Sequence, residues 1–174
     1  MINKKLQNAF LSPKSIAIVG ASSNPKKTSA RVQRYLVNHG YKGDVFPVNP
    51  NREEIFGLKS YPNLTEIKKT IDHVFIAVDG DKILPSIIEA VSLNIKCATI
   101  LSGGFSEAGE EGVKAEKKIL EIAKKGKLRI LGPNSIGLIN ISDSVVLSAN
   151  AMLELKDLKS GGLSVISQSG SLIG

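Results

Sequence analysis

A turn of small residues, Gly20 to Ser23, follows an apolar run and precedes a helix-like pattern that has two lysines at its start. Glycine lets the backbone pass close to a ligand, and Ala21, Ser22 and Ser23 add little bulk. The amide groups at the start of the following helix attract anions. The turn therefore predicts a phosphate site, although its single glycine does not complete the G-x-G-x-x-G pattern and such turns also occur in purely structural settings.

A second polar segment, with Asn49, Pro50 and Arg52, follows the next apolar run. An NAD site would place Asp or Glu here to bind the ribose hydroxyls. Asp44 stands at the wrong end of the run for that role. Arg52 instead favours an extra ribose phosphate, as on coenzyme A or NADP, with a solvent-exposed loop arginine as the alternative.

A third small-residue segment, with Ser102 and Gly103, would let another stretch of backbone approach a ligand. The acidic residues that come after it, Glu107, Glu110 and Glu111, fall in the first turns of the next helical pattern. Carboxylates there complement the helix dipole, so we do not interpret them as a catalytic acid and base.

The histidines and the cysteine predict neither catalysis nor a metal site. His39 lies beside a glycine where a helix ends, and His73 opens an apolar run. Cys97, the only cysteine, lies within an apolar run and is interpreted as a small buried hydrophobic residue. We therefore predict no catalytic residue in this chain.

The elements that must position these segments are five apolar runs rich in Ile and Val, typical of parallel strands that are covered on both faces. The runs span 15–20, 44–49, 73–78, 97–102 and 128–132, and helical patterns lie at 28–38, 64–70, 81–93 and 107–126. This succession predicts an α/β fold with a Rossmann-like, doubly wound, mainly parallel sheet. Ligands bind at the carboxyl ends of such strands.

Composition narrows the class of partner. The 174 residues include 23 Lys and Arg against 16 Asp and Glu, and a formal charge of +7 suits a polyanionic ligand or simply a solvated surface. Nucleic acid is disfavoured because Trp is absent and the other aromatic residues are scattered. No apolar stretch approaches a membrane span, so we expect a cytoplasmic protein.

The C-terminal part predicts a strand within 144–149 and another at 163–167, the latter followed by a turn of small residues. We expect the second of these strands to begin a new domain. The predicted domains are thus 1–158 and 159–174.

Six blocks, in order from about residue 10 to the last residue, resemble the amino-terminal CoA-binding domain of the NDP-forming acyl-CoA synthetases. This superfamily includes the succinyl-CoA synthetase alpha subunit and the ADP-forming acetyl-CoA synthetases. The blocks are "FLSPKSIAIVGASSNPKK", "VFPVNPNREEIFG", "VFIAV", "ILSGGFSEAGEEG", "ILGPNSIGLIN" and "VISQSGSLIG".

The resemblance implies that coenzyme A lies across the strand ends. Its phosphates would meet the Gly20 turn, its adenosine end would lie at the second polar segment, and its thiol would lie near Asn134. The implied contacts are Gly20, Ala21, Ser22, Ser23, Asn49, Pro50, Arg52, Val78, Leu101, Ser102, Gly103 and Asn134.

The chain departs from the family pattern at three of its positions. Ser29 stands where members commonly carry glycine, Asp79 where they carry proline, and Ser135 where they carry cysteine. A carboxylate at Asp79 beside an anionic ligand would weaken binding if it points inward.

In the family, the last block begins a second, flavodoxin-like domain, whose histidine is phosphorylated, and an ATP-grasp subunit or domain supplies the nucleotide chemistry. Four residues match the phosphate site that receives this phosphohistidine: Ser167, Ser169, Gly170 and Ser171. The phosphohistidine has no counterpart in the chain, so we expect it to bind CoA or acyl-CoA without catalysing the acyl-CoA synthetase reaction alone. The alternatives are a split subunit completed by a partner chain and a nucleotide-sensing module that binds NADP; self-association is left open.

Overall fold

A parallel sheet of five strands forms the centre of the computed structural model, which describes residues 3–155 and 157–170. The strand order is β2-β1-β5-β6-β7. The strands are β1 (Ser15–Val19), β2 (Asp44–Val48), β5 (His73–Ile76), β6 (Cys97–Ile100) and β7 (Arg129–Leu131). Each predicted run thus forms a strand one or two residues shorter than expected, and the predicted α/β fold with its parallel sheet is confirmed.

The sheet is buried on both faces, which explains why its strands are apolar without alternation. In β1, Ala17 and Val19 join one hydrophobic cluster, while Ile16 and Ile18 join the cluster on the opposite face. Every residue of β1 is buried.

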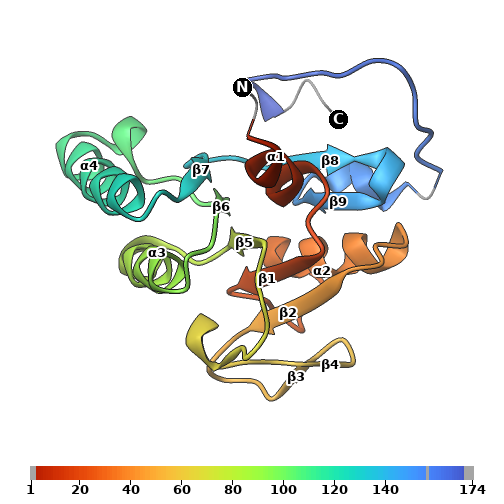
Figure 1. The fold of residues 1–174 in the computed structure, drawn as a ribbon, viewed down its shortest axis with the longest axis horizontal. Coiled ribbons are helices and arrows are strands. Elements are labelled where there is room, and N and C mark those ends of the chain that lie inside the picture. Colours follow the sequence, from red (N-terminus) through yellow and green to blue (C-terminus); the bar gives the residue numbers. More distant parts are fainter. Residues whose placement is uncertain (1–2, 156, 171–174) are drawn as a thin grey trace.

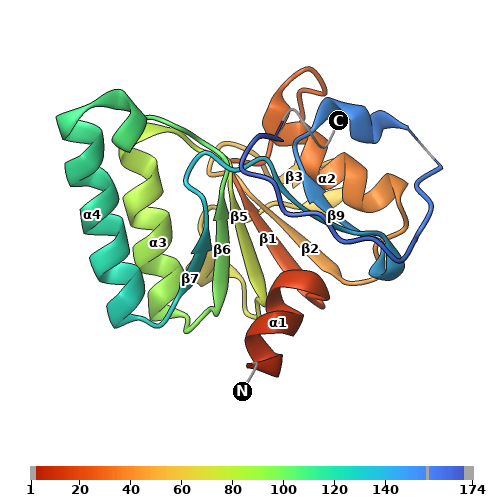
Figure 2. The same cartoon turned by 90° about the horizontal axis from the view of Figure 1, so that it is seen from above.

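Helices cover the two faces unequally. Figure 2 shows α3 (Ile83–Ser92) and α4 (Glu110–Lys125) side by side on one face, and α2 (Thr28–Asn38) on the other. The pattern at 28–38 is confirmed to the residue, and α4 ends at Lys125, one residue before the predicted end. The patterns at 81–93 and 107–126 each begin instead with a 3-10 turn.

The helix expected over 64–70 is wrong. Only a 3-10 turn forms there, Leu64–Glu66, and the Asn63 side chain caps it by accepting from the Glu66 backbone N–H at 3.0 Å. The backbone is already extended at Ile67, and no helix follows before β5. This path buries both Ile67 and Ile71 against the sheet.

Three elements were missed by the sequence analysis, wholly or in part: one helix and two hairpins. Helix α1 (Lys4–Leu11) precedes the sheet. Two short antiparallel hairpins also form, β3 (Glu54–Ile55) with β4 (Leu58–Lys59) and β8 (Gly137–Asn140) with β9 (Val145–Ser148). Strand β9 confirms the strand expected within 144–149, and in Figure 1 its hairpin lies beside α1. Helix α2 packs against β9, so the hairpin completes this layer.

The strand expected at 163–167 is wrong, because residues 157–170 contain no strand. The apolar side chains of Leu163, Val165 and Ile166 are instead exposed to solvent. A strand needs a partner edge for its backbone hydrogen bonds, and the described residues provide none here. In Figure 1 this tail, in dark blue, passes over the β8–β9 hairpin.

Candidate ligand-binding site

The carboxyl ends of the five parallel strands bring the predicted binding residues together along one edge of the sheet. Asn49 follows β2, Gly20 follows β1, Val78 follows β5, Ser102 follows β6 and Asn134 follows β7. The strand order therefore arranges residues that are distant in sequence into one row. The order reverses between β1 and β5, where open α/β sheets bind their ligands.

Gly20 occupies a crowded position in this row. Its φ is +83°, and a Cβ built there would lie 2.7 Å from both the Ala77 carbonyl oxygen and Val78 Cγ1. The Gly20 N–H donates to the Val48 carbonyl at 3.0 Å. Only glycine fits this position, and the turn is held between the ends of two neighbouring strands, β2 and β5.

The turn after Gly20 leads to a helix start that no side chain caps. Ala21 is buried, Ser22 is half-buried and Ser23 is exposed. The Ser22 hydroxyl accepts from the Asn24 N–H at 3.1 Å, so this oxygen serves the turn itself. Lys27, the N-cap of α2, makes no side-chain cap hydrogen bond. The first amides of α2 are thus free of side-chain caps, as an anion site requires.

Asn49 joins the end of β2 to this turn. Its Nδ2 donates to the Ala21 carbonyl at 2.8 Å, and its Oδ1 accepts from the Asn51 N–H at 2.9 Å. Pro50 and Arg52, which follow, are exposed. The Arg52 guanidinium has no hydrogen bond or ion pair within residues 3–155 and 157–170, so it is available to a ligand.

Gln33, which was not predicted, supports this corner of the site. It is buried in α2, and its Nε2 donates to the Ile55 carbonyl at 2.8 Å. This bond fastens the β3–β4 hairpin to α2, and the hairpin follows directly on the Arg52 loop. The sequence hints at this role only in that Gln33 is uncharged and stands next to Val32, which is buried in the same helix.

The ends of β5, β6 and β7 are also linked. The Ser102 hydroxyl donates to the Val78 carbonyl at 2.8 Å, and the Asn134 N–H donates to the Ser102 carbonyl at 3.0 Å. Asn134 has a φ of +57°, a left-handed conformation that asparagine tolerates. Its side chain lies about 3.5 Å from the place where a Cβ on Gly103 would be. Leu101, which precedes this loop, is half-buried.

Glu107 supports the Gly103 loop. Its carboxylate accepts from the Gly104 N–H at 2.7 Å. Hydrogen bonds from backbone N–H groups, its own and that of Gly104, hold the pKa of Glu107 below its usual value. An ionised carboxylate that caps a loop fits the expectation that Glu107 has no acid–base role.

The three positions that depart from the family pattern lie at or beside this edge. Ser29 is half-buried in the first turn of α2, and Asp79 is exposed directly after Val78. Ser135 is half-buried, and its hydroxyl accepts from the Gly137 N–H at 3.3 Å. Asp79 is therefore the one departure that places a charge next to the row.

The C-terminal tail, residues 157–170, returns toward the carboxyl edge of the sheet. A Cβ built on Gly170 would lie 2.9 Å from Ile136 Cδ1, in the connection between β7 and β8. The Ser167 hydroxyl donates to the Ser169 carbonyl at 2.9 Å. Ser171, the fourth residue of the predicted phosphate site, lies outside the described residues.

The histidines and the cysteine lie away from this row. The His39 ring bonds the Leu153 carbonyl at 2.9 Å, and His73 and Cys97 are buried where β5 and β6 begin. Burial raises the pKa of the Cys97 thiol far above its usual value, so the thiol stays protonated. Within residues 3–155 and 157–170, no three His, Cys, Asp or Glu residues are grouped so as to hold a metal ion, and no helix is long and apolar enough to cross a bilayer.

Comparison with known proteins gives a family and several relatives. Residues 14–141 match a family model described as CoA binding domain. The chain is 39% identical over 163 residues to acetate–CoA ligase [ADP-forming] II of Archaeoglobus fulgidus, covering 93% of this chain and 24% of that protein. It is 37% identical to the alpha subunit of acetate–CoA ligase [ADP-forming] II of Pyrococcus furiosus, covering 94% of this chain and 34% of the subunit.

Among solved structures, the chain resembles the dinucleotide-forming acetyl-coenzyme A synthetase 1 of Candidatus Korarchaeum cryptofilum. The TM-score is 0.87 at 34% identity, and the match covers 96% of this chain and 35% of that one. The chain thus spans about a quarter to a third of the length of these relatives.

Proposed function

Since this chain belongs to the CoA binding domain family, we propose that it binds coenzyme A along the carboxyl edge of its sheet. The observation that carries the proposal is the row of residues from Asn49 through Gly20, Val78 and Ser102 to Asn134, in the order of the strands. A long ligand with anionic groups near one end fits such a row. No residue of the row has the partners of a general base or a nucleophile.

Each part of the cofactor has a chemically suitable partner in this arrangement. The uncapped start of α2 and the Gly20 turn receive the diphosphate, because free amides and the helix dipole favour anions there. Asn49, Pro50 and Arg52 flank the adenosine end, with Arg52 on the 3'-phosphate. Val78 and the Leu101–Gly103 segment line the middle, and Asn134 lies toward the thiol.

We further infer that the chain is the CoA-binding part of an NDP-forming acyl-CoA synthetase. In that reaction acyl-CoA, ADP and phosphate give the free acid, CoA and ATP. The residues placed at the edge bind and orient CoA, and an ATP-grasp domain or subunit would have to supply the nucleotide chemistry. A split subunit completed by a partner chain has the same CoA site and differs only in where those other parts are encoded.

The tail supports a domain boundary near residue 158. Leu158 packs against the cluster of Tyr35, Val146 and Leu153, whereas Leu163, Val165 and Ile166 are exposed. Exposed apolar side chains in series are typical of a segment that packs against another surface. We therefore propose 1–158 as the CoA-binding domain and 159–174 as the beginning of a second one, with Ser167, Ser169 and Gly170 facing its phosphate chemistry.

Ligand preference tests this function. Thermal unfolding is measured with saturating CoA, 3'-dephospho-CoA, NADP and NAD in parallel, because a ligand at a hundred times its dissociation constant adds about 2.7 kcal/mol to the free energy of unfolding. We expect CoA to stabilise most. Greater stabilisation by NADP would replace this function with nucleotide sensing, and no stabilisation by any ligand would contradict CoA binding altogether.

Arg52→Ala tests whether this residue contacts the 3'-phosphate of CoA. Removing one exposed cation that pairs with a phosphate is expected to weaken CoA binding about fivefold and to leave 3'-dephospho-CoA binding within about twofold of the wild type. Titration calorimetry measures both affinities. An equal loss for the two ligands would mean that Arg52 does not contact the 3'-phosphate.

Asp79→Asn is expected to strengthen CoA binding about threefold at low salt, because it removes a negative charge from a residue adjoining the row. The gain should shrink as ionic strength rises. Glu121→Gln, an equal change of charge on the exposed surface of α4, serves as the control and is expected to leave the affinity unchanged. Equal gains in both variants would mean that overall charge, and not the position of Asp79, determines the effect.

A further inference from the structure

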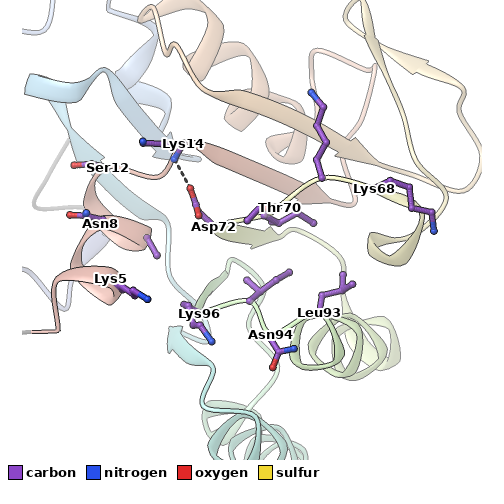
Figure 3. Close-up of a pocket in the computed structure, with 14 residues that line it drawn as sticks. Lys5, Asn8, Ser12, Lys14, Lys68, Thr70, Asp72, Leu93, Asn94 and Lys96 are labelled. Carbon is purple, nitrogen blue, oxygen red and sulfur yellow. Dashed lines mark hydrogen bonds between the residues drawn. The ribbon is translucent and has the colours of Figure 1, made fainter.

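A cavity of about 690 Å³ lies at the opposite edge of the sheet, where the strands begin. Its walls are α1 with the link to β1, the segment that precedes β5, and the segment that precedes β6, as Figure 3 shows. Strand β1 has five residues, so this edge lies roughly 16 Å from the row of residues at the carboxyl edge. The cavity is therefore distinct from the proposed CoA site.

The lining of this cavity is strongly basic. Five of its fourteen lining residues are lysines and one is acidic: Lys5, Lys14, Lys68, Lys69 and Lys96, with Asp72. These lysines come from three segments that are far apart in the sequence, and the fold brings the segments together. The formal charge of the lining is +4, which is more than half of the +7 of the whole chain.

Most of this positive charge is not neutralised by the protein. The Asp72 carboxylate accepts from the backbone N–H of Lys14 at 2.8 Å, Lys69 pairs with Asp44 at 3.2 Å, and Lys68 donates to the Thr65 carbonyl. The ammonium groups of the other three, Lys5, Lys14 and Lys96, have no hydrogen bond or ion pair within residues 3–155 and 157–170. These three lysines line one cavity, and a bound anion would supply the countercharge that the described residues do not.

The wall formed by α1 is fixed in place before any ligand binds. Ala9 lies on α1 and lines the cavity, and its carbonyl bonds the His73 ring at 3.1 Å and accepts from the Cys97 thiol at 3.1 Å. At the start of the helix, the Asn3 side chain accepts from the Leu6 N–H at 3.2 Å. A cavity with walls held in this way is preformed for a ligand.

We propose that this cavity binds a small polyanion, a molecule with two or more phosphate or carboxylate groups. Its volume lies in the range of small-molecule sites. Its cations come from three separate segments, which suits several anionic groups on one compact ligand better than a single one. Asn8, Thr70 and Asn94, which also line it, offer neutral polar groups for the rest of such a ligand. Binding is electrostatic and therefore falls with rising salt.

Inorganic triphosphate is the probe for this site. Backbone amide NMR spectra are recorded during its titration, with and without saturating CoA. We expect shifts at Lys5, Asp72 and Lys96 that persist when CoA is present. In K5Q/K96Q the affinity for triphosphate is expected to fall roughly tenfold. The matched control K117Q/K118Q, which removes two exposed charges from α4, is expected to change it by less than twofold.

Several results would overturn the proposal. Shifts confined to the Gly20 turn would mean that triphosphate reaches only the proposed phosphate site. The spectrum with CoA before triphosphate is added shows separately whether CoA binds. Equal losses in the two double variants would show an unspecific charge effect. Binding of an oligoglutamate peptide without binding of triphosphate would make the cavity part of a protein-docking surface instead.

Discussion

Gly20→Ala is expected to abolish CoA binding and to lower the free energy of unfolding by about 3 kcal/mol. The added methyl group would lie 2.7 Å from the Ala77 carbonyl oxygen, which belongs to backbone and cannot rotate away. The residue would also keep a φ of +83°, which costs about 1 kcal/mol for alanine. Relief of the clash requires the turn to move, and the start of α2 moves with it.

Gly40→Ala is the matched control for this variant. Gly40 has a φ of +77°, follows the far end of α2, and leaves open space, with no heavy atom within 4 Å, where the alanine methyl group would lie. It therefore carries the same conformational cost without the clash. Urea unfolding of both variants and titration with CoA separate the two contributions. If Gly20→Ala were no less stable than Gly40→Ala and bound CoA normally, the turn would not be the phosphate site.

The sheet could be predicted from sequence because parallel strands that are buried on both faces appear as uninterrupted apolar runs. Helix α1 offered no such signal. It is short, and Ala9 is its only buried residue. Strand β8 is a four-residue segment that is half-buried throughout, and its role follows only from pairing with β9. The run at 163–167 has the composition of a strand but no partner edge among the described residues.

That the proposed binding residues lie in one row could be predicted because parallel topology places all carboxyl ends at one edge. Contacts between segments that are distant in the sequence could not be predicted. Gln33 matters because the Ile55 carbonyl lies beside it, and nothing in the local sequence indicates that carbonyl. The basic cavity has the same origin, since Lys5 and Lys96 are 91 positions apart in the chain and meet only in the folded protein.

Acidification is expected to destabilise the protein through His73 by about 3 kcal/mol. Burial lowers the pKa of His73 to about 4, against 6.5 for an exposed histidine, although the Ala9 carbonyl and Asp72 act in the opposite direction. Between these two values the unfolded chain binds a proton that the folded protein does not. The free energy of unfolding therefore falls as pH drops below about 6.5, and the loss is complete below about pH 4, at 1.36 kcal/mol per pKa unit.

The surroundings of His73 explain why the neutral ring is required. Nδ1 lies 3.1 Å from the Ala9 carbonyl and Nε2 lies 2.9 Å from the Thr99 hydroxyl. A neutral ring can donate to the carbonyl and accept from the hydroxyl at once. A second ring proton would remove the acceptor for Thr99 and place a charge where no solvent reaches it. The Nδ1–H bond to the Ala9 carbonyl is kept in either state, so the cost of protonation falls on the Thr99 bond and on the buried charge.

Urea unfolding of the wild type and His73→Gln between pH 7 and pH 4.5 measures this contribution, because carboxylates titrate in both proteins and cancel in the difference. The variant is expected to be less stable at pH 7, where it lacks the ring's contacts, and the gap should narrow by about 2 kcal/mol at pH 4.5. Thr99→Val, which keeps the histidine, should retain the steep pH dependence of the wild type. Parallel curves for the wild type and His73→Gln would mean that the ring reaches solvent in the folded state.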